Sequence, residues 1–308
     1  MRACAIMVLA AACGLGGSSG GGDENLPTSG IGPYGKITDY DFSTPLDEPF
    51  LVVDNAADLL DPAPIELPGF AARLFYTRRT DATAEIWRAD LSSLEDEPEN
   101  AVPVLVASEP WEQGRVEAPA PFRAGDVLYL VYQAGDPVAP VLGWAASTDG
   151  GASFVKRGML IEDGAQPSAL QLGNATFVYF TRPEGIFVAT SIGLATFAVR
   201  PQPVLGAAGG QRFDARAVGE PAAVGGLSPA GELRIGLFYT GTATNGVAAI
   251  GYAGSFDGTT FTHSLEPILE PGPPSEHGAG PLIAPTSGVL FFSQARGGRA
   301  AIAVATAP

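Results

Sequence analysis

Short apolar runs separated by glycine and proline turns follow one another along most of this chain. The clearest run, residues 127–132, reads Val-Leu-Tyr-Leu-Val-Tyr and is almost wholly apolar instead of alternating with polar residues. Such a pattern is typical of a strand that is buried on both faces. A second run at 142–147, a turn at 148–154 and a third run at 159–161 follow it. The pattern predicts a small antiparallel sheet.

The same order of elements recurs along the chain. Corresponding second strands are predicted at residues 74–77, 177–180, 235–239 and 289–293. Each copy opens on a polar, mostly proline-containing motif, and the five motifs begin at Asp61, Glu117, Gln166, Glu220 and His277. Their spacing is roughly 49 to 57 residues, which is typical of radial repetition of one small sheet. The sequence therefore predicts an all-β, five-bladed β-propeller.

The two ends of the chain are predicted to close the ring. The fifth copy ends at Pro308 before an outer strand, whereas residues 40–51 read like the outer strand of the fourth copy at 261–269. We therefore expect the N-terminal segment 40–53 to complete the last blade and to protect its edges. The propeller is expected to span residues 36–308.

Composition and charge support this fold and exclude one class of partner. The 40 glycines and 27 prolines suit a protein with many tight turns, and 46% hydrophobic residues can fill its core. The net charge is −16, and no run of Lys or Arg offers a stripe for a phosphate backbone. We expect no nucleic-acid partner and a monomer, with the acidic surface serving solubility.

The first residues are typical of an export signal. Residues 1–12 combine Arg2 with an apolar run that is too short to span a membrane, and Cys13 follows directly. Residues 9–13 resemble a bacterial lipobox, so we expect lipid on Cys13 and a flexible linker over 13–35. The protein would then lie in the cell envelope, lipid-anchored on the outer membrane or periplasmic face, or be secreted. A plain disordered N-terminus is the alternative.

Candidate chemistry lies at the five openings, because the entrance strands of a propeller converge on one axis. This geometry would bring together the first residues of the motifs, with Arg115 and Trp111 just ahead of the second motif. Trp111, Tyr132 and Trp144 are candidate aromatic platforms for a sugar. We expect no cofactor and no metal site, with a calcium ion on the axis as the alternative.

The chain resembles the five-bladed glycosidases, nearest to glycoside hydrolase family 43, over about residues 40–308. The resemblance rests on the blade motif of an acid, Pro, a strand and Ser-x-Asp-Gly-x-x-Phe. It implies a general-base Asp61, a general-acid Glu220 and a His277 near the funnel floor. Gln166 stands where the family has a supporting Asp, so Asp163 or Glu117 would have to replace that charge.

The resemblance therefore implies a glycoside hydrolase with a two-carboxylate mechanism acting on a polysaccharide or oligosaccharide. Gln166 favours the alternative, a glycan-binding or interaction propeller that has lost activity. Each acid also has a structural interpretation, since Asp61 before Pro62 can start a turn and Glu117 or Glu220 can cap loops at a solvated mouth. His277 is expected to be structural or to contact substrate. Asp149 and Asp257, in the Ser-x-Asp-Gly turns, are expected to bond nearby backbone amides.

Overall fold

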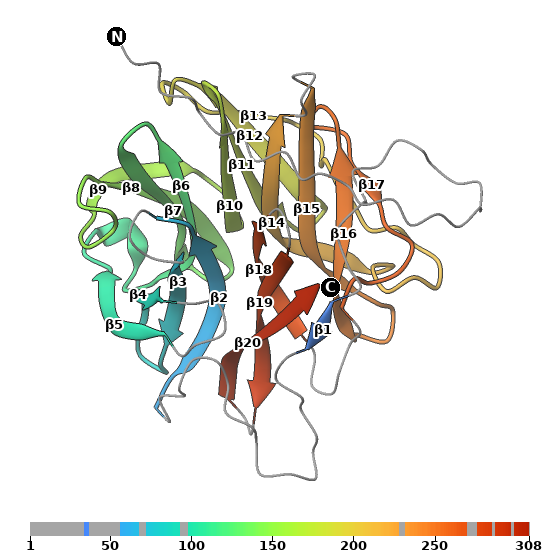
Figure 1. Ribbon diagram of the computed structural model, residues 1–308, viewed down its shortest axis with the longest axis horizontal. Helices are drawn as coiled ribbons and strands as arrows, with labels where there is room; N and C mark the ends of the chain where they lie inside the picture. Colours follow the sequence, from blue (N-terminus) through green and yellow to red (C-terminus); the bar gives the residue numbers. More distant parts are fainter. Residues whose placement is uncertain are drawn as a thin grey trace.

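The computed structural model describes residues 34–36, 56–67, 72–92, 98–227, 232–269, 276–284, 287–296 and 299–307. They form five four-stranded antiparallel sheets set around a common centre (Figure 1). Blades one and two contain β2 (Asp58–Ile65), β3 (Ala72–Arg79), β4 (Ala84–Leu91) and β5 (Glu99–Leu105), then β6 (Val116–Ala124), β7 (Val127–Asp136), β8 (Ala139–Ser147) and β9 (Val155–Ile161). Blades three and four contain β10 (Ala165–Leu172), β11 (Ala175–Arg182), β12 (Gly185–Ile192) and β13 (Ala198–Val199), then β14 (Ala217–Leu227), β15 (Leu233–Thr242), β16 (Ala248–Ser255) and β17 (Thr262–His263). Blade five contains β18 (Glu276–Ala284), β19 (Ser287–Arg296), β20 (Arg299–Ala307) and β1 (Gly35–Lys36). The predicted five-bladed propeller is confirmed.

The core consists of five hydrophobic clusters, and each cluster lies between two adjacent blades. Strand β7 shows how one strand contributes to two of them. Leu128, Leu130 and Tyr132 pack toward blade one, while Val131 packs toward blade three. Because both faces of the strand are buried, an apolar residue is favoured at nearly every position. This explains why the sequence of the second strands does not alternate.

An N-terminal strand completes blade five, as predicted, but it lies earlier in the chain than expected. Strand β1 pairs antiparallel with β20, with Gly35 opposite Thr306 and Lys36 opposite Ala305. Residues 40–53, to which we assigned this strand, lie outside the described residues. A two-residue strand has no periodicity of its own, so the sequence could not mark its position.

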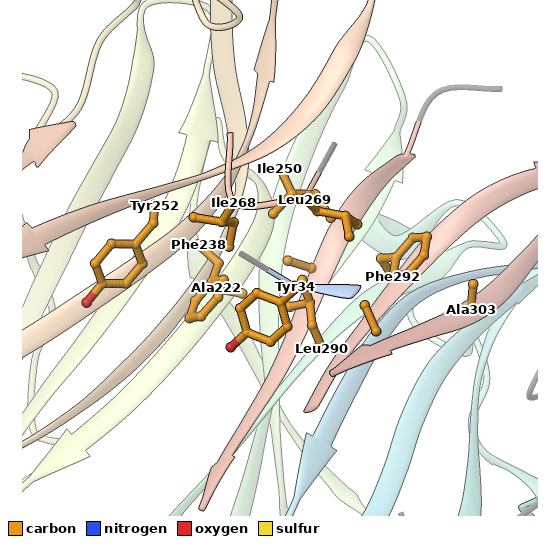
Figure 2. Packing of buried hydrophobic residues seen from close by; sticks show 12 residues of the cluster. Tyr34, Ala222, Phe238, Ile250, Tyr252, Ile268, Leu269, Leu290, Phe292 and Ala303 are labelled. Carbon is orange, nitrogen blue, oxygen red and sulfur yellow. The ribbon is translucent and has the colours of Figure 1, made fainter. Parts of the chain in front are cut away.

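Tyr34 anchors this closing strand between blades four and five. Figure 2 shows its ring among Phe238, Ile268 and Leu290, in the cluster that joins the two blades. Tyr34 is 6% exposed, meets Phe238 edge-on at 6.2 Å, and its amide donates to the Ile268 carbonyl at 2.9 Å. The ring of blades is thus closed by side-chain packing in addition to two residues of strand pairing.

Nothing in the described part bears on membrane attachment. Among the described residues, no helix is long and apolar enough to cross a membrane. The predicted signal at 1–12, the predicted lipidation site Cys13 and most of the predicted linker lie outside the described residues.

Candidate active site

Each inner strand carries a β-bulge near its start, and the bulges meet at the centre of the ring. In blade one, the pairing of β2 with β3 shifts between Leu60 and Ala63, so two residues on β2 oppose one on β3. In every blade, the first of the two bulged residues has a left-handed backbone. These residues are Asp61 (φ 53°), Ala118 (φ 50°), Gln166 (φ 49°), Glu220 (φ 49°) and Gly278 (φ 65°).

In two blades the bulge residue lies one position after the first residue of the predicted motif. Blade two places Ala118 at the bulge instead of Glu117, and blade five places Gly278 there instead of His277. In blades one to four the bulge residue directly precedes a proline, as Ala118 precedes Pro119. Aligning the motifs on that proline, instead of on their first polar residue, would have identified Ala118.

A bulge leaves one backbone amide without a partner in its own sheet, and here the preceding blade supplies that partner. The acceptor is always a side chain on the second strand of that preceding blade. It belongs to the residue directly after the one that lies opposite that blade's own bulge. The five bonds are Asp61 N to Ser293 Oγ (3.1 Å), Ala118 N to Thr77 Oγ1 (2.8 Å), Gln166 N to Gln133 Oε1 (2.9 Å), Glu220 N to Thr181 Oγ1 (2.9 Å) and Gly278 N to Thr240 Oγ1 (3.1 Å). They form a complete ring of hydrogen bonds around the axis.

Sequence reasoning missed these five acceptors, although they share a signal. Each directly follows an aromatic residue in a second strand, as in Tyr76-Thr77, Phe180-Thr181 and Phe292-Ser293. Threonine is common in strands for reasons of packing, so a single copy of this pair is uninformative. Only the fivefold repetition at one position relative to the bulge marks these residues as functional in the ring.

The two axial acids are held in the same way. Thr77 Oγ1 donates to Asp61 Oδ2 at 2.7 Å, and Thr240 Oγ1 donates to Glu220 Oε2 at 2.6 Å. In both cases the same hydroxyl accepts the bulge amide of the next blade. Glu220 is one methylene longer, and its Oε2 also accepts from the Gly278 amide at 2.8 Å. Its Oε1 accepts from Gln166 Nε2 at 2.9 Å.

An axial cavity of about 100 Å³ opens between the five inner strands. Its polar side chains come from blades one, three and four, whereas Ala118 and Pro119 make an apolar wall at blade two. The cavity is lined by Asp61, Pro62, Ala63, Pro64, Ala118, Pro119, Ala120, Pro121, Gln166, Pro167, Ser168, Ala169, Glu220, Pro221, Ala222, Ala223, Gly278, Ala279, Gly280 and Pro281. Because most of these residues are small, a ligand could come close to the backbone and to the acids.

Asp61 and Glu220 approach each other over Gly278. A Cβ at Gly278 would lie 3.9 Å from Asp61 Oδ1, and the Gly278 amide is 2.8 Å from Glu220 Oε2. With standard backbone dimensions these contacts place the two carboxyl groups no more than about 9 Å apart. Both acids are partly buried. The structure therefore brings together three predicted residues, Asp61, Glu220 and Gln166.

Glu117 and Arg115 lie behind the cavity and are not among its lining residues. Glu117 is 7% exposed, pairs with Arg115 at 3.1 Å and accepts from Gln133 Nε2 at 2.9 Å. Gln133 in turn accepts the amide of Gln166. Glu117 and Arg115 therefore hold the amide that anchors the bulge of blade three.

Trp111 packs outside the axial cavity, in a motif that also occurs in blade four. Its ring stacks on Tyr132 at 6.2 Å, close to Gly143, and the next residue is the buried Glu112. Both lie in a short 3₁₀ helix, η1 (Pro110–Glu112), which ends six residues before the bulge residue Ala118. The same arrangement in blade four consists of Phe213, Asp214, Tyr239 and Gly251. Trp111 is therefore a structural residue.

The two buried acids of this motif are stabilised as carboxylates. Asp214 accepts from Tyr239 at 2.7 Å, from Arg212 at 2.9 Å and binds His263 Nδ1 at 2.8 Å. Burial opposes ionisation of Asp214, but these hydrogen bonds outweigh it and hold its pKa below the ordinary value. Glu112 likewise has a lowered pKa, since bonds from backbone amides and Lys156 outweigh its burial.

The other predicted aromatic platforms are also part of the packing. Tyr132 is fully buried and donates to Glu112 at 2.9 Å. Trp144 stacks on Tyr129 at 5.8 Å and meets Phe197 edge-on at 6.1 Å, between blades two and three. Neither residue lines the axial cavity.

The Ser-x-Asp-Gly turns are architectural, as predicted. Asp149 accepts from the Ser153 amide at 3.0 Å and from Ser147 Oγ at 2.6 Å, and hydrogen bonds from both serines hold its pKa well below the ordinary value. Asp257 accepts from the Thr259 amide at 2.7 Å. Both turns lie at outer strands, away from the cavity lining.

The remaining candidate, His277, pairs with Ser293 through the backbone of β18, and its side chain lies outside the described part. Among the described residues, no group of three or more His, Cys, Asp and Glu side chains is arranged to hold a metal ion.

Solved structures similar to this chain include glycoside hydrolases and mannoside phosphorylases. A glycosyl hydrolase from Bacteroides ovatus shares 16% identity and a TM-score of 0.67, over 91% of this chain and 95% of that one. A structure from the family 130 mannoside phosphorylases, which contain hydrolases that target β-1,2 mannosidic linkages in Candida mannan, has 17% identity, a TM-score of 0.67 and the same coverage. The β-1,2-mannobiose phosphorylase of Listeria innocua, in complex with β-1,2-mannobiose, has 12% identity and a TM-score of 0.65 over 83% of this chain and 91% of that one. No family model and no curated protein matches the sequence. At these identities the likeness establishes the fold.

Proposed function

We propose that this chain is a carbohydrate-active propeller that hydrolyses a glycosidic bond at its axial cavity. The observation that carries the proposal is the pair Asp61 and Glu220, two carboxyl groups on one cavity and within about 9 Å of each other. The similarity of the fold to glycoside hydrolases and mannoside phosphorylases supports the assignment. Fold alone would not support it, because propellers carry many unrelated functions.

The reaction would use the two carboxyl groups on opposite sides of the bond. One carboxylic acid protonates the leaving oxygen, while the other, as carboxylate, activates water or attacks the sugar directly. Inverting enzymes place the two groups about 6.5–9.5 Å apart and retaining enzymes about 5–5.5 Å apart. The limit set by Gly278 admits both separations.

The cavity favours a sugar at the end of a chain. Its volume of about 100 Å³ is well below the roughly 300–1,000 Å³ of pockets that enclose a drug-sized ligand. We therefore expect one terminal residue to enter along the axis, with the rest of the oligosaccharide outside. The apolar wall of Ala118 and Pro119 would contact the C–H face of that sugar, and the acids its hydroxyl groups.

A panel of substrates tests this function. Purified protein is incubated with aryl arabinosides, xylosides and mannosides, and with β-1,2-mannobiose in the presence and absence of inorganic phosphate. We expect cleavage of at least one substrate, and, on substrates with a poor leaving group, a loss of at least about 100-fold in Asp61→Asn and in Glu220→Gln. Glu162→Gln, at an exposed glutamate, is the matched control. Turnover that survives in Glu220→Gln would refute the role of that residue.

The bond between Gln166 and Glu220 favours a second candidate, a glycan-binding propeller without turnover. Gln166 supplies an amide where the related glycosidases are expected to have a carboxylate. This candidate predicts binding of the same oligosaccharides by calorimetry with no product released after long incubation. Failure to bind or cleave any member of the panel would refute both candidates.

The location in the cell envelope remains a proposal that rests on Cys13. A chain lipidated there would be recovered with membranes and would incorporate labelled palmitate, and Cys13→Ala would release it as soluble protein. Equal recovery of both proteins in the soluble fraction would contradict the lipid anchor. Sedimentation of the propeller would test the expected monomer.

A further inference from the structure

Glu220 receives hydrogen bonds from three different blades. Gln166 Nε2 of blade three lies 2.9 Å from Oε1, and Thr240 Oγ1 of blade four lies 2.6 Å from Oε2. The backbone amide of Gly278, in blade five, lies 2.8 Å from Oε2. An ionised carboxylate only accepts hydrogen bonds, whereas a protonated one must also donate one. The three partners therefore match the ionised form.

Two of these donors have a fixed direction. The Gly278 amide can only donate. The Thr240 hydroxyl oxygen already accepts from that amide at 3.1 Å, so its proton is directed toward Glu220. Gln166 is the remaining partner, and its backbone is held in the bulge by Gln133 at 2.9 Å, which places its side-chain amide against Oε1.

We propose that Gln166 is a positioning residue that keeps Glu220 ionised, so that Glu220 accepts a proton and Asp61 supplies one. This inference rests on the proposed function and reverses the roles that the family resemblance implies. In that family pattern a carboxylate at position 166 would repel the charge of Glu220 and keep it protonated. An amide in its place donates a hydrogen bond and has the opposite effect. Among the described side chains, Asp61 is the other carboxyl group on the cavity.

The Asp61 carboxylic acid gives its proton to the glycosidic oxygen as the bond from that oxygen to the anomeric carbon breaks, and the bonding electrons leave with the oxygen. Water attacks the anomeric carbon from the opposite face and loses a proton to the Glu220 carboxylate. Proton transfer through solvent from Glu220 to Asp61 restores the starting state.

Carboxyl titration by NMR tests the protonation state without any substrate. Protein labelled with ¹³C at the glutamate carboxyl groups is titrated, and Glu220→Gln identifies the resonance of Glu220. We expect a midpoint below the ordinary value of about 4.3. Gln166→Met, which keeps the length of the side chain but removes the donor, should raise that midpoint, and Gln166→Glu should raise it by at least about 1 unit. Gln171→Glu adds the same charge near the other end of β10 and should leave it unchanged.

A wild-type midpoint above about 4.3, or one that does not respond to Gln166→Met, would overturn the inference. This holds whether or not the protein cleaves a glycoside, so the inference and the proposed function can fail separately. The wild-type midpoint alone decides the matter if the Gln166 variants do not fold.

Leaving-group dependence tests the assignment of roles. For the sugar cleaved in the panel, rates are compared on its dinitrophenyl and 4-methylphenyl glycosides. A dinitrophenolate needs no proton to leave, so Asp61→Asn should retain most activity on that substrate but lose at least about 100-fold on the other. Glu220→Gln should lose activity on both. The reverse pattern would restore Glu220 as the acid and overturn the inference.

Discussion

Replacing Thr77 by valine should weaken the hydrogen-bonded ring at one defined point. Thr77 is fully buried, accepts the Ala118 amide at 2.8 Å and donates to Asp61 at 2.7 Å. Valine has nearly the same shape, so packing is kept while both bonds are lost. The buried Ala118 amide then lacks an acceptor, which costs about 1–3 kcal/mol, and the bond to the partly solvated Asp61 contributes about 1 kcal/mol more.

We therefore expect Thr77→Val to lower the free energy of unfolding by about 2–4 kcal/mol and the melting temperature by roughly 5–10 °C. Urea denaturation followed by circular dichroism measures the first quantity. Thr181→Val removes only the bond to the Glu220 amide and should cost about 1–2 kcal/mol, while Thr262→Val, at an exposed threonine of β17, is the control.

The comparison of these variants decides whether the ring stabilises the fold. A loss below about 0.5 kcal/mol in Thr77→Val, or an equal loss in Thr262→Val, would refute the reasoning, because surface substitutions commonly change stability by that amount. Since Thr77 also holds the Asp61 carboxyl group, activity on the substrate panel should fall in Thr77→Val more than in Thr181→Val.

Three further predictions concern the interface of blades five and one, a buried acid and the apolar wall of the cavity. Gly280→Ala would bring a Cβ against the Pro62 carbonyl oxygen, so we expect the free energy of unfolding to fall by about 1–3 kcal/mol in thermal unfolding. We expect almost no change for Gly206→Ala, whose Cβ would meet only an ordinary contact at 3.7 Å. Asp214 has a lowered pKa in the fold, so its contribution is present above about pH 4 and is lost as the pH falls through the folded pKa. Asp214→Asn should therefore be less stable at pH 7 in urea, and its gap to the natural protein should narrow below pH 4, whereas a constant gap would contradict this. Ala118→Asn should keep or slightly raise the melting temperature, because asparagine tolerates the left-handed backbone better than alanine, and a marked loss would argue against the bulge geometry.

The fold was predictable because each blade repeats the same physical constraints. Second strands buried on both faces need unbroken apolar runs, and these runs recur in every copy. The Asp-Gly turns of blades two and four need positive φ and therefore mark those two copies. The closing strand left no such mark. Gly35 and Lys36 pair with β20, and the neighbouring Tyr34 packs in an environment formed by blades distant in sequence.

A site residue was predictable only where the polar residue that opens a motif is also the residue at the bulge. Asp61, Gln166 and Glu220 are both the first polar residue of their motif and the bulge residue, so either alignment finds them. Glu117 is polar and precedes its bulge by one residue, and a one-residue shift in a strand turns a side chain to another face. Trp111 and Arg115 precede the motif in sequence, but their contacts depend on the fold of the loop between blades.

Because the ring of hydrogen bonds uses backbone amides, the stability of the propeller does not depend on which side chains face its central cavity. Each bulge is anchored through a backbone amide, and that bond is the same whether the residue is an acid, an amide, alanine or glycine. The side chains facing the cavity can therefore change without loss of the anchor that positions them. Among the described residues, only Thr77 and Thr240 serve both purposes, since each accepts a bulge amide and donates to an axial acid. Loss of these hydroxyls should damage structure and function together, whereas a change at Gln166 should alter function and leave the fold intact.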